Sequence, residues 1–187
     1  EAVLDILGTI HHLSYFTEDF EINISCPNTH AVTTNYQRSL DDLLRPICLD
    51  LATRGKKGYL KVSPDVDHDG VRQILAVASQ YDAIRGFVVA NTTRQRIVNG
   101  IPEDQKLGGA SGDAVYAIAL KAQWLFADEI ATNYAHKDWE IHACGGIRTA
   151  ERVKQRMDIG NVTRLQVYTP LIYEGPGLIR TIRKAAA

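Results

Sequence analysis

Short apolar runs alternate with longer segments of helical periodicity along the whole chain. The pattern predicts strands at about 20–25, 58–63, 85–90, 139–144 and 163–168, and helices at about 1–14, 38–54, 69–81, 112–134, 148–157 and 175–185. The run Gly-Phe-Val-Val-Ala at 86–90 is apolar at every side-chain position, as buried parallel strands are. This alternation indicates an α/β fold built from right-handed strand–helix–strand units.

Five such units are compatible with an open doubly wound sheet or with part of a barrel. A complete (β/α)8 barrel typically needs about 200–250 residues, and this chain has 187. Its first predicted element is a helix that leads into a strand, so we expect earlier strand–helix units of a barrel to be missing from it.

Composition restricts the possible functions only broadly. With 45% hydrophobic residues, 23% charged residues and a net charge of -1, the chain has ordinary globular usage and no general attraction to nucleic acid or anionic lipid. No apolar run is long enough to cross a bilayer. The three cysteines fit a reducing compartment better than a disulfide framework, and the six histidines show no metal-type or triad spacing.

The residues that end the first predicted strand carry the strongest chemical signal. Pro27 stops the strand because it has no N–H to donate. Asn23, Cys26 and Asn28 therefore gather at its carboxyl end, where parallel sheets and barrels bind their ligands. A thiol between two neutral amides suits a planar, polar small molecule. A turn asparagine beside a buried cysteine is the alternative explanation.

Two further strand ends carry related groups. Lys61 lies inside an apolar strand, where an unpaired ammonium is costly, so we expect it to face an anion or an electron-rich ring. A lysine that is ion-paired or extends its amine to solvent is the alternative. Asn91 and Thr92 follow the next strand directly and add a second amide and a hydroxyl to the same rim.

Glycine-rich loops precede or follow the later elements. The run 108–112 precedes the longest predicted helix, and Gly145 and Gly146 follow the fourth strand, while Tyr168 and Thr169 end the fifth. Two successive strand-end loops that face helix N-termini can hold a phosphate. Because the chain has no GxGxxG turn, a mononucleotide such as FMN fits better than NAD.

Taken in order, these segments resemble dihydroorotate dehydrogenase, the FMN enzyme family of pyrimidine biosynthesis. The matching segments are 23–29 (NISCPNT), 60–65 (LKVSPD), 91–93 (NTT), 108–112 (GGASG), 145–147 (GGI), 165–169 (LQVYT) and 173–178 (YEGPGL). The segments 91–93 and 173–178 resemble in particular the membrane-associated, quinone-reducing class 2 enzymes. The resemblance implies that residues 1–187 are the carboxyl-terminal portion of an FMN-binding barrel, comprising roughly its last five strand–helix units.

The resemblance also implies roles for individual residues. Cys26 would be the catalytic base that removes the C5 proton of dihydroorotate while a hydride leaves C6 for the flavin. The substrate would be held by Asn23, Asn28, Asn91 and Thr92. The FMN would be held by Lys61, Gly109, Gly146, Tyr168 and Thr169. Implied partners are dihydroorotate and orotate, a quinone, and a complementary chain that supplies the missing strands; the implied location is the mitochondrial inner membrane or a bacterial membrane.

Departures from the family pattern keep two other hypotheses open. Class 2 enzymes usually carry serine at the position of Cys26, and residues 30–34 (HAVTT) replace the usual Gly-Leu-Arg of the loop that closes over the substrate. The first alternative is a non-catalytic subunit that is derived from the dehydrogenase and serves a larger assembly. The second is a different FMN-dependent barrel oxidoreductase, which would keep the phosphate loops but not the asparagine set.

Overall fold

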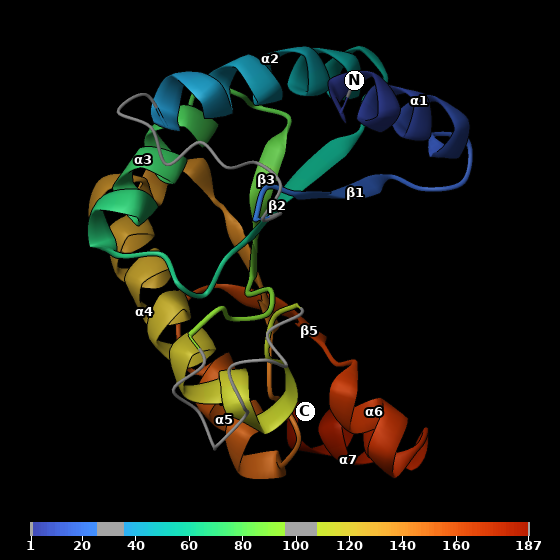
Figure 1. The fold of residues 1–187 in the computed structure, drawn as a ribbon, viewed down its shortest axis with the longest axis vertical. Coiled ribbons are helices and arrows are strands. Elements are labelled where there is room, and N and C mark those ends of the chain that lie inside the picture. The colour runs from blue at the N-terminus through green and yellow to red at the C-terminus, as the bar shows by residue number, and fades with distance from the viewer. Residues whose placement is uncertain (1, 26–35, 96–107, 187) are drawn as a thin grey trace.

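The computed structural model describes residues 2–25, 36–95 and 108–186, which form one parallel sheet and the helices that connect its strands (Figure 1). The strands are β1 (Asp19–Asn23), β2 (Lys57–Val62), β3 (Ile84–Val89), β4 (Glu140–Cys144) and β5 (Val162–Gln166). All five predicted strands are confirmed, with ends that differ by one or two residues. Every neighbouring pair is parallel, so the carboxyl ends of all strands lie at one edge of the sheet.

The helices also follow the predicted order. They are α1 (Ala2–Leu13), α2 (Tyr36–Thr53), α3 (His68–Ala78), α4 (Tyr116–Asn133), α5 (Ala150–Met157), α6 (Thr169–Glu174) and α7 (Gly177–Ala186), with the 3-10 turns η2 (Gly112–Val115) and η3 (Ala135–Lys137). Two details differ from the prediction. The segment predicted as one helix over 112–134 begins with η2, and α6 was not predicted because six residues are too few to show a helical period.

The strand order decides between the two architectures that periodicity alone left open, and it agrees with the barrel that the family resemblance implied. The order β1-β2-β3-β4-β5 follows the chain without reversal. A doubly wound sheet reverses its order at a switch point, and this one does not. Since each right-handed crossover moves in the same direction, the helices pass over the same face, and the sheet curves as part of a barrel wall does (Figure 1).

The helix-covered face of the sheet holds the main hydrophobic core. Alternate strand residues such as Ile22, Leu60, Phe87 and Ile141 are buried there. They pack with helix residues including Leu44, Leu51, Leu75 and Phe126. A smaller cluster joins α7 to α5 and β4 through Leu178, Ile182, Val153, Ile147 and Ala143. Burial of these side chains supplies the main driving force for the fold.

The opposite face, which we call the inner face, is polar. It carries Asp19, Glu21, Tyr59, Glu140, His142, Arg164 and Gln166. Arg164 bonds to Asp19 and Gln166 bonds to Glu21, so side chains join the two edge strands β5 and β1. The interior of a closed barrel is usually filled by branched apolar residues, and this inner face departs from that rule.

Candidate active site

A pocket of about 200 Å³ lies at the carboxyl ends of β2 to β5. Its polar lining comes from one strand, three strand-end segments and the start of η2. These are Lys61 of β2; Asn91 and Thr92 after β3; Gly145 and Gly146 after β4; Tyr168 and Thr169 after β5; and Ser111 and Gly112 at η2. Its apolar lining includes Ala90, Val115, Ile147 and Val167. An apolar wall with a few convergent polar groups is the usual composition of a small-molecule site.

Six of the residues singled out from the sequence line this pocket together, namely Lys61, Asn91, Thr92, Gly146, Tyr168 and Thr169. Gly109 lies beside the pocket and packs against Thr92. A Cβ added to Gly109 would have the Thr92 hydroxyl as its nearest neighbour. Cys26 and Asn28 lie outside the described residues. The convergence is a finding of the structure, and the binding roles of the individual residues remain predictions.

Asn23 and Asn91 meet at one corner of the strand ends. The Asn91 side-chain amide donates to Ser25 Oγ at 2.7 Å and to Asn23 Oδ1 at 3.4 Å. The same Asn23 oxygen accepts from the backbone N–H of Ser25 at 3.1 Å. These bonds orient the two amides that the sequence predicted to lie together, although they come from strands that are not neighbours in the sheet.

Asp65 ties the residues after β3 to the residues after β2. Its carboxylate accepts from the Thr93 hydroxyl and, at 2.7 Å, from the backbone N–H of Arg94. Thr93 also pairs with Ala110 in an antiparallel bridge, in which both backbone N–H groups donate at 2.8–3.1 Å. Asp65 and Thr93 therefore hold the Asn91–Thr92 segment against the glycine-rich run that precedes η2.

The turn after β4 depends on glycine. Gly145 and Gly146 have φ values of 107° and 68°, which residues other than glycine rarely adopt. A Cβ on Gly146 would lie 2.6 Å from the Tyr116 Cβ and 2.8 Å from the Gly112 carbonyl oxygen. The turn ends at the N-terminus of α5, where Thr149 Oγ1 accepts from the Arg152 N–H at 3.3 Å and caps the helix.

A buried arginine lies behind the pocket, and the sequence analysis missed it. Arg156 of α5 is fully buried, and its Nη2 donates to the carbonyl oxygens of Val89 at 2.5 Å and Cys144 at 3.0 Å. Burial lowers the pKa of Arg156 to about 10. The guanidinium thus joins the ends of β3 and β4. No local pattern distinguishes it from the exposed basic residues of the same helix.

The inner face carries a second polar cluster near the pocket. His142 is fully buried, stacks on Tyr59 with 4.1 Å between ring centroids, and lies 3.9 Å from Glu21 Oε1. The nearby His142 ring lowers the pKa of Glu21, against the effect of burial, and Gln166 and the charge of Lys61 lower it further. None of the histidines was singled out from the sequence, because this environment is assembled only by the sheet.

Two negative observations concern the described residues only. In the ranges 2–25, 36–95 and 108–186, no group of three or more His, Cys, Asp or Glu side chains could hold a metal ion. Among the helices of these same ranges, none combines the length and apolar character needed to cross a bilayer.

Comparisons with known proteins give a consistent result. A family model described as "Dihydroorotate dehydrogenase" matches residues 1–186. The chain is 32% identical over 192 residues to the dihydroorotate dehydrogenase (quinone) of Anaeromyxobacter sp. (strain Fw109-5), which covers all of this chain and 51% of that protein. It is 33% identical over 169 residues to the protein of the same name from Aliivibrio fischeri (strain MJ11). This match covers 86% of this chain and 48% of that protein.

Solved structures show the same relationship. A crystal structure of DHODH from Eimeria tenella in complex with ferulenol superimposes with a TM-score of 0.77 at 25% identity, covering 98% of this chain and 52% of that one. The ligand-free form of the Eimeria tenella protein gives a TM-score of 0.76 at 26% identity. The chain spans about half the length of the curated relatives it matches. These matches confirm the predicted fold as part of a (β/α)8 barrel.

Proposed function

The chain belongs to the dihydroorotate dehydrogenase family, and from that premise we propose that its protein oxidises dihydroorotate to orotate, with hydride transfer to FMN, in pyrimidine biosynthesis. The observation that carries the proposal is the pocket at the strand ends, where six residues predicted from the family pattern converge. A site at the carboxyl ends of the strands is also where barrel enzymes carry out their chemistry.

The pocket residues fit a flavin mononucleotide. The turn at Gly145 and Gly146, which leads to the N-terminus of α5, and the hydroxyls of Ser111 and Thr169 offer donors for a phosphate. Lys61 provides a cation on the strand side of the pocket. Gly109, Gly146, Tyr168 and Thr169 complete the proposed cofactor set. FMN, when bound, supplies the acceptor for the hydride that leaves the substrate.

The proposed substrate set comprises four residues. Asn23, Asn28, Asn91 and Thr92 would hold the carboxylate and ring amides of dihydroorotate, and the bonded pair Asn23–Asn91 supports this placement. Cys26 would accept the C5 proton, since a thiol with a reference pKa of about 8.5 ionises nearer neutrality than a serine hydroxyl does. Cys26 and Asn28 are proposed from the family pattern alone.

The electron acceptor is proposed from the relatives. The curated relatives from Anaeromyxobacter and Aliivibrio are named as quinone enzymes, so we propose a quinone as the second substrate. The remaining strands of the barrel would complete the site. A separate complementary chain is one source of those strands. None of the findings favours the alternative of a non-catalytic subunit.

The proposal is tested on the full-length protein, purified without added flavin. We expect the visible absorbance of bound FMN, and we expect this absorbance to bleach when dihydroorotate is added in the absence of oxygen. A colourless protein that takes up no FMN would contradict the proposal. Bound FMN that does not bleach with dihydroorotate would instead support a different FMN-dependent oxidoreductase.

A further inference from the structure

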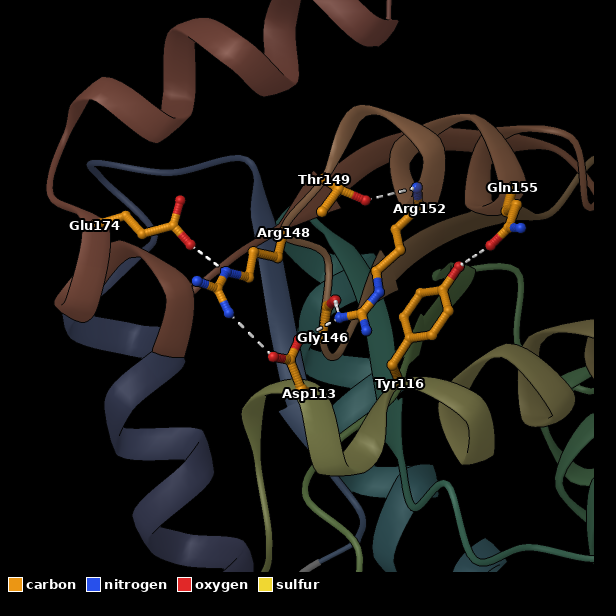
Figure 2. A network of polar contacts seen from close by, with 8 residues as sticks. All are labelled: Asp113, Tyr116, Gly146, Arg148, Thr149, Arg152, Gln155 and Glu174. Carbon is orange, nitrogen blue, oxygen red and sulfur yellow. Dashed lines mark hydrogen bonds and ion pairs between the residues drawn. The ribbon is translucent and has the colours of Figure 1, made fainter.

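A network of four charged side chains joins three segments at the rim of the pocket (Figure 2). Asp113 of η2 lies at its centre. One carboxylate oxygen accepts from Arg148 Nη1 at 3.1 Å, and the other accepts from Arg152 Nη1. Both arginines lower the pKa of Asp113, Arg152 more strongly. Arg148 also bonds to Glu174, at the end of α6. We call Asp113, Arg148, Arg152 and Glu174 the rim network.

Arg152 fixes the glycine turn after β4. Besides bonding to Asp113, its Nη1 donates to the Gly146 carbonyl oxygen at 2.9 Å. The guanidinium lies over the Tyr116 ring, 4.3 Å from its centroid (Figure 2). Because a trans peptide unit is planar, holding the Gly146 carbonyl toward Arg152 points the N–H of Ile147 to the opposite side. Ile147 lines the pocket, so Arg152 sets the direction of a donor in the pocket wall.

Arg148 fixes the segment after β5. Its bond to Glu174 anchors the end of α6, and α6 begins at the pocket residue Thr169. The Thr169 hydroxyl donates to Ser111 Oγ at 3.0 Å, directly before η2. The rim network therefore joins the segments that begin at Ser111, Gly145 and Tyr168, and these segments contribute the proposed phosphate donors.

The rim network itself stays outside the pocket. Its four residues are absent from the described pocket lining, and Asp113, Arg148 and Glu174 border a neighbouring groove instead. Two arginines and two carboxylates also cancel in charge, so the network adds no net attraction for an anion. Its contribution to the pocket is the relative placement of three loops.

We propose that the rim network is a positioning clamp that aligns the three loops around the phosphate of the flavin and thereby sets the preference for FMN over riboflavin. This inference rests on the proposed function, because it assumes a flavin in this pocket. Loss of the clamp lets the loops move apart, which weakens donors to the phosphate but leaves the contacts to the ring system in place.

The experiment compares the dissociation constants of FMN and riboflavin for the full-length apoprotein, measured by quenching of flavin fluorescence. Asp113→Asn removes the charge that holds both arginines. We expect FMN binding to weaken by about fivefold to tenfold with riboflavin binding unchanged. Arg148→Met removes the bonds to Asp113 and Glu174 but leaves Arg152 bonded to Asp113 and Gly146, so we expect a smaller loss of the same kind. The Arg148 side chain is half exposed, so this variant is expected to fold.

The matched control is Asp50→Asn, which removes the carboxylate of an ion pair with Arg54 on α2, 2.9 Å long and away from the pocket. Its FMN and riboflavin constants are expected to equal those of the wild type. If Asp113→Asn weakens the binding of FMN and riboflavin equally, or changes neither dissociation constant, the proposed clamp is overturned. Failure of the wild type to bind FMN would overturn the proposed function instead, so the two failures are distinguishable.

Discussion

The three cysteines illustrate how single residues of the same type differ in chemistry. Cys48 is buried inside α2, and burial raises its pKa to about 12. Cys144 borders the pocket, but burial raises the pKa of its thiol as well, against the opposing charges of Lys61 and Arg156. A thiol that stays protonated at neutral pH is a poor base. Neither described cysteine therefore competes with Cys26 for the proposed role.

We predict that Cys26→Ala leaves FMN bound and slows its reduction by dihydroorotate by about 10²-fold or more, since a positioned base typically contributes that much. Stopped-flow absorbance under anaerobic conditions measures the rate. Cys48→Ala is the matched control and is expected to reduce its flavin at the wild-type rate. Unchanged kinetics in Cys26→Ala would remove this residue as the base.

The loops between elements determine the shape of the pocket. Gly55 and Gly146 have nearly the same φ, 66° and 68°, but their surroundings differ. A Cβ on Gly55 would meet nothing within 4 Å, whereas one on Gly146 would overlap with Tyr116 and the Gly112 carbonyl. The glycine after α2 serves only the chain reversal, and the glycine after β4 also allows η2 to approach the turn.

Alanine substitutions at Gly55 and Gly146 distinguish the cost of backbone strain from the cost of crowding. We expect Gly55→Ala to lower the free energy of unfolding by about 1–2 kcal/mol, the cost of a left-handed conformation. Gly146→Ala should cost a further 1–3 kcal/mol or so because η2 must move, and it should also weaken FMN binding. Chemical denaturation and flavin titration of the full-length variants measure both effects. Equal losses in the two variants would contradict the crowding argument.

At the scale of the whole molecule, polar side chains connect the two edges of the curved sheet. Arg164 and Gln166 of β5 reach Asp19 and Glu21 of β1 across the inner face. Arg164 also lies over the Tyr59 ring, 5.6 Å from its centroid, and His142 stacks on the same ring. These contacts favour the curvature that brings the strand-end loops around one pocket. They also make the fold sensitive to the charge of Glu21.

The folded protein lowers the pKa of Glu21 below its ordinary value of 4.5. Its carboxylate therefore stabilises the fold above that pH, and the contribution is lost as the pH falls through the folded-state pKa. We predict that Glu21→Gln has a lower unfolding midpoint than the wild type at pH 7. The difference should shrink as the pH falls below the ordinary value of 4.5 and close once the pH has passed the lowered folded-state pKa. Urea denaturation at several pH values measures it. A difference independent of pH would assign the effect to lost packing rather than to charge.

Much of the architecture follows from local patterns. The alternation of apolar strands with amphipathic helices predicts all five strands and six of the seven described α-helices, because side-chain periodicity is a property of neighbouring residues. The motifs around Asn23, Lys61, Asn91 and Gly146 likewise indicate the family and the edge of the sheet that carries the pocket. Only α6 escapes this reasoning, since its six residues are too short to show a period.

Tertiary structure decided the rest. Periodicity alone does not distinguish a barrel wall from a doubly wound sheet, and the strand order does. The rim network joins Asp113 to Arg148 and Arg152, 35 and 39 residues away, and the tie between Arg164 and Asp19 spans 145 residues. Sequence spacing does not encode such pairs, because they form only when the sheet brings distant loops together. The sequence therefore predicts six of the residues that line the pocket, and the packing of the elements determines what holds them there.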